Sequence, residues 1–211
     1  MKNKVVLVIG STGNIGKLVV SQLGSQNCKV IAMVRDKSLA SFGPEVNVVE
    51  GDLESNFESL LHNVDCVVFT AGSGATTGFD KTLLVDLWGA CKAIDASKKS
   101  GVKHFIMISS IGADDPDNGL ESIKPYLVAK HFADDYLIAS GLPYSILRPG
   151  RLTNDEGLGL ITTIRPSEQS QQAVSRQDTA KAIIHCVNDK QTHGKIFELY
   201  KGKFKLEEVL T

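Results

Sequence analysis

The residue pair in this sequence best suited to acid–base chemistry is a tyrosine followed four residues later by a lysine, Tyr126 and Lys130. The segment from Tyr126 to Ile138 has helical periodicity, and residues four apart share one face of a helix. An ammonium group close to a phenol favours the phenolate, so it would lower the tyrosine pKa from its usual value of about 10. Such a tyrosine can exchange a proton with a substrate oxygen. The alternatives are a pair that contacts a cofactor without reacting and a tyrosine that only packs against the sheet.

A second candidate site is the run Gly10-Ser11-Thr12-Gly13-Asn14-Ile15-Gly16, which has the spacing G-x-x-G-x-x-G. It lies between an apolar, β-branched segment and a segment whose aliphatic residues recur at helical spacing. Glycines permit a tight turn and let the backbone approach a pyrophosphate, whose charge is favoured by free N–H groups and the helix dipole. The spacing alone is a weak signal, and a glycine-rich turn without a ligand is the alternative. Its place between a strand and a helix favours dinucleotide binding.

Charged residues after the next two strands bear on which dinucleotide would bind. Arg35 ends the second apolar strand, where an acidic residue would bind a ribose 2′-hydroxyl and a basic one a 2′-phosphate. A guanidinium donates two hydrogen bonds to a phosphate, so Arg35 favours NADP over NAD, although Asp36 follows it and a solvated cation is the alternative. Asp52, after the third strand, is placed to accept from an adenine amino group, and is equally suited to cap a helix beginning near Glu54.

The elements that would position these residues alternate between apolar strands and amphipathic helices. Continuously apolar strands indicate a parallel sheet covered on both faces, and their alternation with helices is that of a doubly wound fold. We predict an α/β protein with a single Rossmann-type domain over residues 1–211, of which 151–211 contribute a small substrate-side region. The polar segments 113–122 and 151–172 are expected to line the ligand site. The predicted strands are residues 4–9, 28–34, 46–50, 65–71, 103–108, 144–147 and 195–200, and the main helices cover the regions 15–23, 80–99, 126–138 and 178–187.

Composition and charge narrow the classes of function. The 211 residues are 42% hydrophobic and 22% charged, which is typical of a soluble globular protein. A formal net charge of -1 argues against nucleic-acid binding. No apolar run approaches the ~18 residues of a membrane span, and four scattered cysteines indicate buried thiols in a reducing compartment, so we expect a cytoplasmic protein without a membrane partner. The five histidines have no metal-binding spacing, so no metal site is expected.

Together these motifs resemble those of the atypical short-chain dehydrogenase/reductases. Within that family the sequence is most similar to the small NAD(P)H-binding proteins named as NAD(P)-dependent epimerase/dehydratases. The resemblance extends from Lys4 to about Gly202, and the full set in this order is more specific than any single motif. The motifs that carry it are the glycine run 10–16, Val34-Arg35, Asp52-Leu53, Ala71-Gly72-Ser73-Gly74, Ser109-Ser110, Tyr126-x-x-x-Lys130 and Arg148-Pro149-Gly150.

The resemblance implies which residues would react and which would hold NADP(H). A serine, a tyrosine and a lysine perform the family's chemistry, and these correspond to Ser110, Tyr126 and Lys130. Asp86 stands where many relatives have an asparagine that serves the proton relay. Ser109 competes with Ser110 for the orienting role, because strand alternation points only one of them into the cleft. The implied cofactor-binding residues are Gly10, Thr12, Gly13, Asn14, Ile15 and Gly16 in the phosphate-binding turn, Arg35 at the adenosine phosphate, Asp52 and Leu53 at adenine, Ala71 and Gly72 at the nicotinamide-side ribose, Ser109, Lys130 at the ribose hydroxyls, and Pro149 and Gly150 near the carboxamide.

The short segment after the sixth strand bears on the substrate. Only residues 151–211 remain there, whereas the extended relatives that act on sugar nucleotides carry a much longer carboxyl-terminal region. We therefore expect hydride transfer to a small carbonyl, quinone or flavin acceptor. An NADP(H)-binding sensor or regulatory protein without turnover is one alternative, and a sugar epimerase or dehydratase is another. A monomer and a homodimer are both compatible with the sequence.

Overall fold

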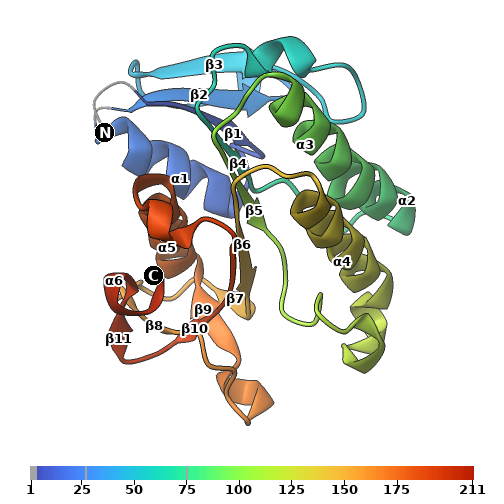
Figure 1. The fold of residues 1–211 in the computed structure, drawn as a ribbon, viewed down its shortest axis with the longest axis vertical. Coiled ribbons are helices and arrows are strands. Elements are labelled where there is room, and N and C mark those ends of the chain that lie inside the picture. The colour runs from blue at the N-terminus through green and yellow to red at the C-terminus, as the bar shows by residue number, and fades with distance from the viewer. Residues whose placement is uncertain (1–3, 27, 75) are drawn as a thin grey trace.

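The computed structural model of the protein describes residues 4–26, 28–74 and 76–211. In these residues a nine-stranded sheet has the order β11-β8-β10-β6-β5-β4-β1-β2-β3. The helices α1 (Asn14–Gly24) and α5 (Arg176–Asn188) cover one face, and α3 (Ala90–Lys99) and α4 (Lys124–Ala139) cover the other (Figure 1). The predicted α/β class, with a mostly parallel sheet and helices on both faces, is therefore confirmed.

The strand order fixes where a ligand can bind. β1 to β6 pair in parallel, β10 adds a parallel strand beside β6, and β8 and β11 are antiparallel additions. Because β1 lies between β2 and β4, the strand order reverses there, and open α/β sheets bind ligands at the carboxyl ends of the strands at such a reversal. The strands are β1 (Val5–Ile9), β2 (Lys29–Val34), β3 (Val46–Glu50), β4 (Cys66–Phe69), β5 (His104–Ile108), β6 (Tyr144–Pro149), β8 (Leu160–Thr162), β10 (Lys195–Lys201) and β11 (Phe204–Lys205).

The central strands are apolar throughout because both of their faces are covered. In β1, Val6 and Val8 belong to the core cluster that includes residues of α1 and α5, whereas Leu7 and Ile9 belong to the cluster that includes residues of α3 and α4. All four side chains are fully buried. Burial on both faces is what makes a parallel strand a continuous apolar run in the sequence. The four cysteines are also buried as free thiols, as predicted.

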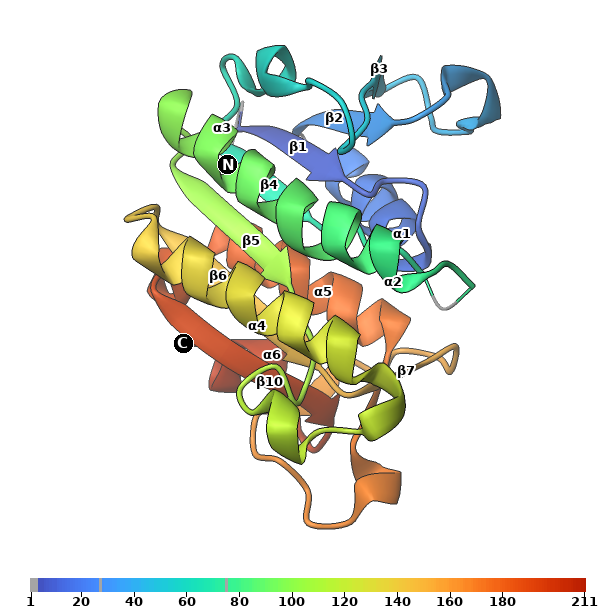
Figure 2. The same cartoon turned by 90° about the vertical axis from the view of Figure 1, so that its right-hand side faces the viewer.

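The helix predicted for the region 80–99 has a π-helical centre. α2 (Phe79–Lys81), the π-helical segment η3 (Thr82–Gly89) and α3 follow one another along one face of the sheet (Figure 2). Segments of π-helix occur frequently at functional sites. Here η3 packs against α4, and it buries Thr82, Asp86 and Gly89. The segment thus brings an acidic side chain into the protein interior beside α4. Among the helices that the structure describes, none has the length and apolar character needed to cross a membrane.

Several short elements differ from the sequence prediction. No helix begins near Glu54, because Asp52 caps a turn there and the next helix is the 3-10 helix η2 (Glu58–Leu61). β7 (Arg151–Thr153) and β9 (Ala173–Ser175) form a separate two-stranded sheet, and three residues are too few to show a period. The remaining helices are η1 (Lys37–Leu39), η4 (Pro116–Asn118), η5 (Glu121–Ile123), η6 (Gln169–Gln171), η7 (Lys190–Thr192) and α6 (Leu206–Val209).

Candidate active site

A cleft of about 440 Å³ opens at the carboxyl ends of β1, β2, β3 and β4, on both sides of the reversal in strand order. Its walls are the glycine turn, the end of β2, the segment after β3 and the segment after β4. This is the place where doubly wound sheets bind ligands. Eight of the residues predicted to bind a cofactor line the cleft: Gly10, Thr12, Gly13, Arg35, Asp52, Leu53, Ala71 and Gly72.

The glycine turn packs so tightly that two of its positions exclude side chains. Gly10 has a left-handed φ of +85°, and a Cβ there would lie 2.5 Å from the backbone nitrogen of Ala71. A Cβ on Gly16 would collide with the Gly10 carbonyl oxygen. The turn is closed by the Gly13 N–H, which donates to that same oxygen at 3.0 Å. Glycine is therefore required for the close approach of β1, α1 and the segment after β4.

The first turn of α1 is arranged to receive an anion. Helix α1 begins at Asn14, its N-cap is Gly13, no side chain caps it, and its first turn contains no acidic residue. Helix dipole and backbone N–H groups favour a negative charge at such an end. Asn14 is exposed and Ile15 is buried beneath the turn. The glycine cradle and the uncapped helix thus fit the pyrophosphate of a dinucleotide.

Arg35 places a positive charge at the end of β2. Its exposed side chain lines the cleft. The neighbouring carboxylate of Asp36 accepts hydrogen bonds from the hydroxyl and the backbone N–H of Ser38, at 2.6 and 2.8 Å, and these bonds lower the pKa of Asp36. Asp36 therefore caps η1 and is not among the residues that line the cleft.

The segment after β3 forms another wall of the cleft. Asp52 Oδ1 accepts a hydrogen bond of 2.9 Å from the Glu54 N–H, and the Leu53 side chain is buried. Lys81 of α2 donates to both carboxylate oxygens of Glu54, at 2.7 and 2.8 Å. Because Glu54 and Lys81 both line the cleft, this ion pair joins two of its walls.

The segment after β4 connects the cleft with Asp86. The Asp86 side chain is only 1% exposed, and its Oδ2 accepts a hydrogen bond of 3.0 Å from the Ser73 N–H. Within the described residues its Oδ1 has no hydrogen-bond partner, and this oxygen lies 3.1 Å from where a Cβ on Gly72 would be. A buried carboxylate thus lies directly behind the wall that Gly72 forms.

The other three predicted catalytic residues lie beside Asp86. The Ser110 hydroxyl contacts the Tyr126 phenol, and the charges of Asp86 and Asp134 act on the same phenol. Lys130 is 1% exposed, with its Nζ 6.0 Å from the centroid of the Phe69 ring. Residues from η3, from α4 and from the turn after β5 are therefore brought together, although none of the three lines the cleft itself.

The electrostatics of this cluster differ from the sequence prediction. Burial raises the pKa of Tyr126, the carboxylates of Asp86 and Asp134 raise it further, and the contact with Ser110 lowers it. Burial lowers the pKa of Lys130, and the same two carboxylates raise it. The prediction of a lowered tyrosine pKa counted the ammonium alone, and was wrong because desolvation and two nearby anions favour the neutral phenol.

The two neighbouring serines have different partners. Ser109 is buried, and its hydroxyl donates to Asp134 Oδ2 at 2.7 Å. Arg148 Nε donates to the same oxygen at 3.0 Å. The Ser110 hydroxyl donates to the Ile111 carbonyl at 3.0 Å and contacts Tyr126. Of the two serines, Ser110 is thus the one beside the tyrosine, and the hydroxyl of Ser109 is held on Asp134.

Pro149 and Gly150 are buried at the end of β6. The Ile111 N–H donates to the Pro149 carbonyl at 3.2 Å, and the Gly150 N–H donates to the Leu199 carbonyl at 3.0 Å. A Cβ on Gly150 would lie 2.5 Å from the carbonyl oxygen of Gln172. These two residues are outside the lining of the cleft and hold the turn after β5 against β10 and the segment before β9.

An open parallel sheet, a cleft at its reversal of strand order and a glycine turn at the start of a helix define a Rossmann-type dinucleotide-binding protein. Residues 10–190 match the NAD(P)H-binding family, and the chain belongs to this family. The resemblance to the small NAD(P)H-binding members of the atypical short-chain dehydrogenase/reductases is thereby confirmed.

Relatives that match nearly the whole chain include proteins from three bacteria. A Bacillus subtilis protein named as an uncharacterized sugar epimerase is 42% identical, over 97% of this chain and 98% of its own. A Bacillus halodurans structure named for an NAD-dependent epimerase/dehydratase has a TM-score of 0.91 and 41% identity, and covers 98% of both chains. The oxidoreductase ylbE from Lactococcus lactis has a TM-score of 0.88 and 31% identity, over 98% of this chain and 94% of its own.

Charged residues that were not predicted from the sequence surround the predicted ones. Glu54 and Lys81 are far apart in the sequence, so nothing in a local pattern indicates their ion pair. Asp134 is different, because Tyr126, Lys130 and Asp134 are spaced by four residues along α4 and share one face of it. Extending the helical spacing by one more turn would have found it.

Proposed function

We propose that the protein is an NADP(H)-dependent reductase that transfers a hydride to a small carbonyl, quinone or flavin acceptor. The observation that carries this proposal is the cluster of Ser110, Tyr126 and Lys130 around Asp86, whose Oδ1 lies behind Gly72, with Arg35 lining the cleft at the end of β2. A dinucleotide with its pyrophosphate on the glycine turn would have its adenosine phosphate at Arg35. Its nicotinamide end would then lie toward Tyr126.

The preference for NADP over NAD rests on the different positions of Arg35 and Asp36. A carboxylate that receives a ribose 2′-hydroxyl favours NAD, whereas a guanidinium receives a 2′-phosphate. Asp36 is engaged with Ser38, and Arg35 lines the cleft. Asp36 is therefore not placed to bind a ribose hydroxyl, whereas Arg35 can bind the 2′-phosphate.

The residues of the cluster have distinct tasks in this proposal. The bound nicotinamide supplies the hydride. Tyr126 donates its phenolic proton to the acceptor atom that gains charge, and its raised pKa keeps this proton in place at neutral pH. The Ser110 hydroxyl orients the same atom by hydrogen bonding, and the Lys130 ammonium donates to the ribose hydroxyls. Asp86 fixes the Gly72-Ser73 segment through its bond to the Ser73 N–H.

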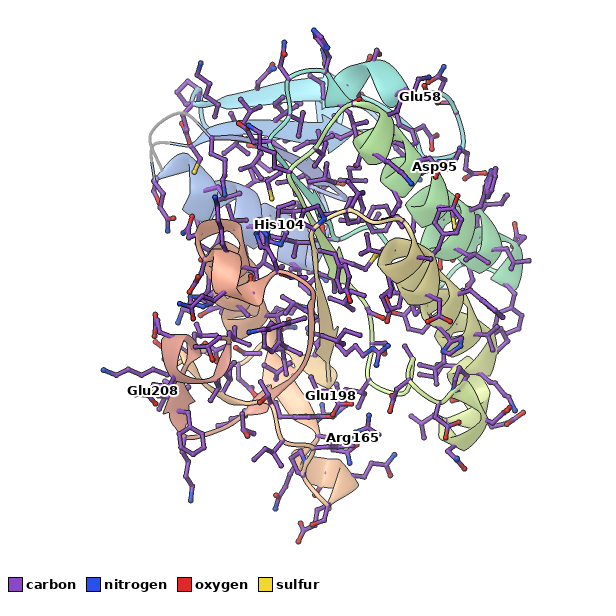
Figure 3. The ribbon with its side chains drawn as sticks, in the orientation of Figure 1. Glu58, Asp95, His104, Arg165, Glu198 and Glu208 are labelled. Carbon is purple, nitrogen blue, oxygen red and sulfur yellow. The ribbon has the colours of Figure 1, made fainter. Side chains whose placement is uncertain are left out.

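Residues 151–211 form the substrate side of the single domain that we propose. Arg165 donates to the two carboxylate oxygens of Asp114, at 3.1 and 3.0 Å. It also pairs with Glu198, and these two side chains are labelled in Figure 3. These contacts connect the loop after β8 with the loop after β5 and with β10.

The experiment that tests the proposal measures cofactor binding and cofactor consumption by the same preparation. NADPH and NADH are titrated calorimetrically, and the near-ultraviolet absorbance of each is then followed with quinones, flavins, aldehydes, ketones and nucleotide sugars. We expect tighter binding of NADPH and its consumption with at least one small acceptor. Binding of NADPH without consumption would favour a sensor, and turnover of a nucleotide sugar alone would favour an epimerase or dehydratase; either result would overturn the proposal.

A further inference from the structure

A buried acidic residue without a task in the proposed reaction lies one helical turn beyond Lys130. Asp134 of α4 has no exposed surface, and its Oδ2 accepts from both Ser109 and Arg148, at 2.7 and 3.0 Å. Among the residues that the structure describes, none donates to its Oδ1. A carboxylate in the protein interior is costly unless it is paired, so its position needs a physical reason.

One physical reason for a buried carboxylate at position 134 is the charge of Lys130. This ammonium is buried beside the Phe69 ring, and the two anions that act on it are Asp86 from η3 and Asp134 from its own helix. Tyr126 experiences the same two carboxylates together with the Ser110 hydroxyl. Burial raises the pKa of Asp134, and Lys130, Ser109 and Arg148 each act in the opposite direction and favour its charged form. Two anions and two cations are thus enclosed together, which a buried cluster of charges requires.

A second reason is the geometry of the turn after β5. Through its bond to the Ser109 hydroxyl, Asp134 ties the residue before Ser110 to α4. Arg148 reaches the same carboxylate from β6, so one side chain joins three neighbouring elements. The position of Ser110 against Tyr126 depends on this turn.

We propose that Asp134, held by Arg148, is a positioning residue that fixes the Ser109-Ser110 turn, provides a counter-charge for the Lys130 ammonium, and so sets the pH range of NADPH binding and turnover. This inference rests on the proposed function, because it assigns a task to a residue behind the same site. A merely structural ion pair between α4 and β6 would stabilise the fold without affecting that pH range.

Two variants distinguish a positioning role of Asp134 from that of a merely structural ion pair. Asp134→Asn keeps the size of the side chain and an oxygen that accepts from Ser109, but removes the charge. The double variant Asp134→Leu/Arg148→Met replaces the pair by apolar side chains, which often leaves stability unchanged or higher. Asp95→Asn is the matched control, since Asp95 is an acidic residue of α3 that accepts from Tyr136 on the exposed side of α4, at 2.9 and 3.0 Å.

The measurement is the affinity for NADPH and the ratio kcat/KM, each as a function of pH, together with Tm. Without the Asp134 charge, Lys130 and Tyr126 lose their protons more readily, so the alkaline limit of both profiles should move down by about one pH unit. We expect this shift in both Asp134 variants, even where the double variant restores Tm, and no shift for Asp95→Asn. Unchanged profiles in variants whose Tm alone falls would overturn the inference while the proposed function stands. Failure of the wild-type protein to bind or consume NADPH would instead overturn the proposed function.

Discussion

Asp86 accepts a hydrogen bond of 3.0 Å from the backbone N–H of Ser73, which lines the cleft next to Gly72. The side chain thereby connects the π-helical segment η3 with the segment after β4. Its Oδ1 lies behind Gly72, and its charge adds to the effect of burial in raising the pKa of Tyr126. A change at Asp86 should therefore affect the chemistry of the tyrosine without removing any residue that lines the cleft.

Asp86→Asn should move the alkaline limit of turnover to lower pH. The carboxylate disfavours the phenolate, so its removal lowers the pKa of Tyr126, and the tyrosine must be protonated to act as the donor. We expect a shift of about one pH unit in the profile of kcat/KM, with NADPH still bound at neutral pH. Asp80→Asn, which changes an exposed acidic residue of α2, is the control and should leave the profile in place. A shift in the opposite direction would show that Asp86 does not act on Tyr126 as a charge.

Arg35→Ser should weaken NADPH binding and leave NADH binding nearly unchanged. The charge-assisted hydrogen bonds to the 2′-phosphate are lost, and bonds of this kind contribute about 1.5–3 kcal/mol, which corresponds to roughly 10- to 150-fold in affinity. Lys37→Ser provides a matched control, because Lys37 is an exposed cation two residues further along that does not line the cleft. Equal losses of affinity for the two cofactors in Arg35→Ser would place the adenosine phosphate elsewhere.

Gly16→Ala should destabilise the protein and abolish cofactor binding. The new Cβ would collide with the Gly10 carbonyl oxygen, so the glycine turn must move. Overpacking of this kind costs about 1–3 kcal/mol, which a fall in Tm would report. In Gly24→Ala, at the other end of α1, the atoms nearest the new Cβ belong to the flexible side chain of Glu45, at 3.1 Å, so Tm and binding should change little. Normal NADPH affinity in Gly16→Ala would contradict the placement of the pyrophosphate.

Stability should fall in acid because of a buried histidine far from the cleft. His104, at the start of β5, bonds Ser145 at 2.9 Å, and its Nδ1 has no partner among the described residues. Burial, and secondarily the charges of His193 and Lys4, lower its pKa to about 3. As the pH falls below about 6.5, His104 of the unfolded chain therefore binds a proton, whereas His104 of the folded chain stays neutral. The contribution of His104 to the free energy of unfolding is thus complete above about pH 6.5 and is lost toward pH 3. The loss is at most about 1.4 kcal/mol per pH unit.

Denaturant unfolding between pH 4 and pH 8 measures this effect. His104→Gln should show a shallower dependence of the free energy of unfolding on pH than the wild type. His62→Gln changes an exposed histidine and should keep the wild-type slope. Identical slopes in all three proteins would assign the acid sensitivity to other groups.

The main strands, the order of elements and the dinucleotide cleft were predictable from the sequence, because each depends on local patterns. Continuously apolar strands indicate burial on both faces of the sheet. The glycine turn and Arg35 directly follow two strands whose carboxyl ends lie at the same edge of the sheet. The direction of the Tyr126 pKa shift was not predictable, since it depends first on the burial of the phenol and then on Asp86 and Asp134, which only the packing of η3 and α4 brings together. Ion pairs such as Glu54 with Lys81 join residues distant in the sequence and leave no local pattern.

The most direct test of the central claim compares NADPH consumption by the wild type, Tyr126→Phe and Tyr136→Phe with the same acceptor. Tyr136 lies on the same helix, is exposed and donates to Asp95, so it controls for the loss of a phenolic hydroxyl from α4. The account predicts that Tyr126→Phe binds NADPH with wild-type affinity and consumes it at least 100-fold more slowly, the usual contribution of a general acid being about 10²–10⁴. It predicts nearly wild-type rates for Tyr136→Phe. Undiminished consumption by Tyr126→Phe would contradict the assignment of Tyr126 as the proton donor.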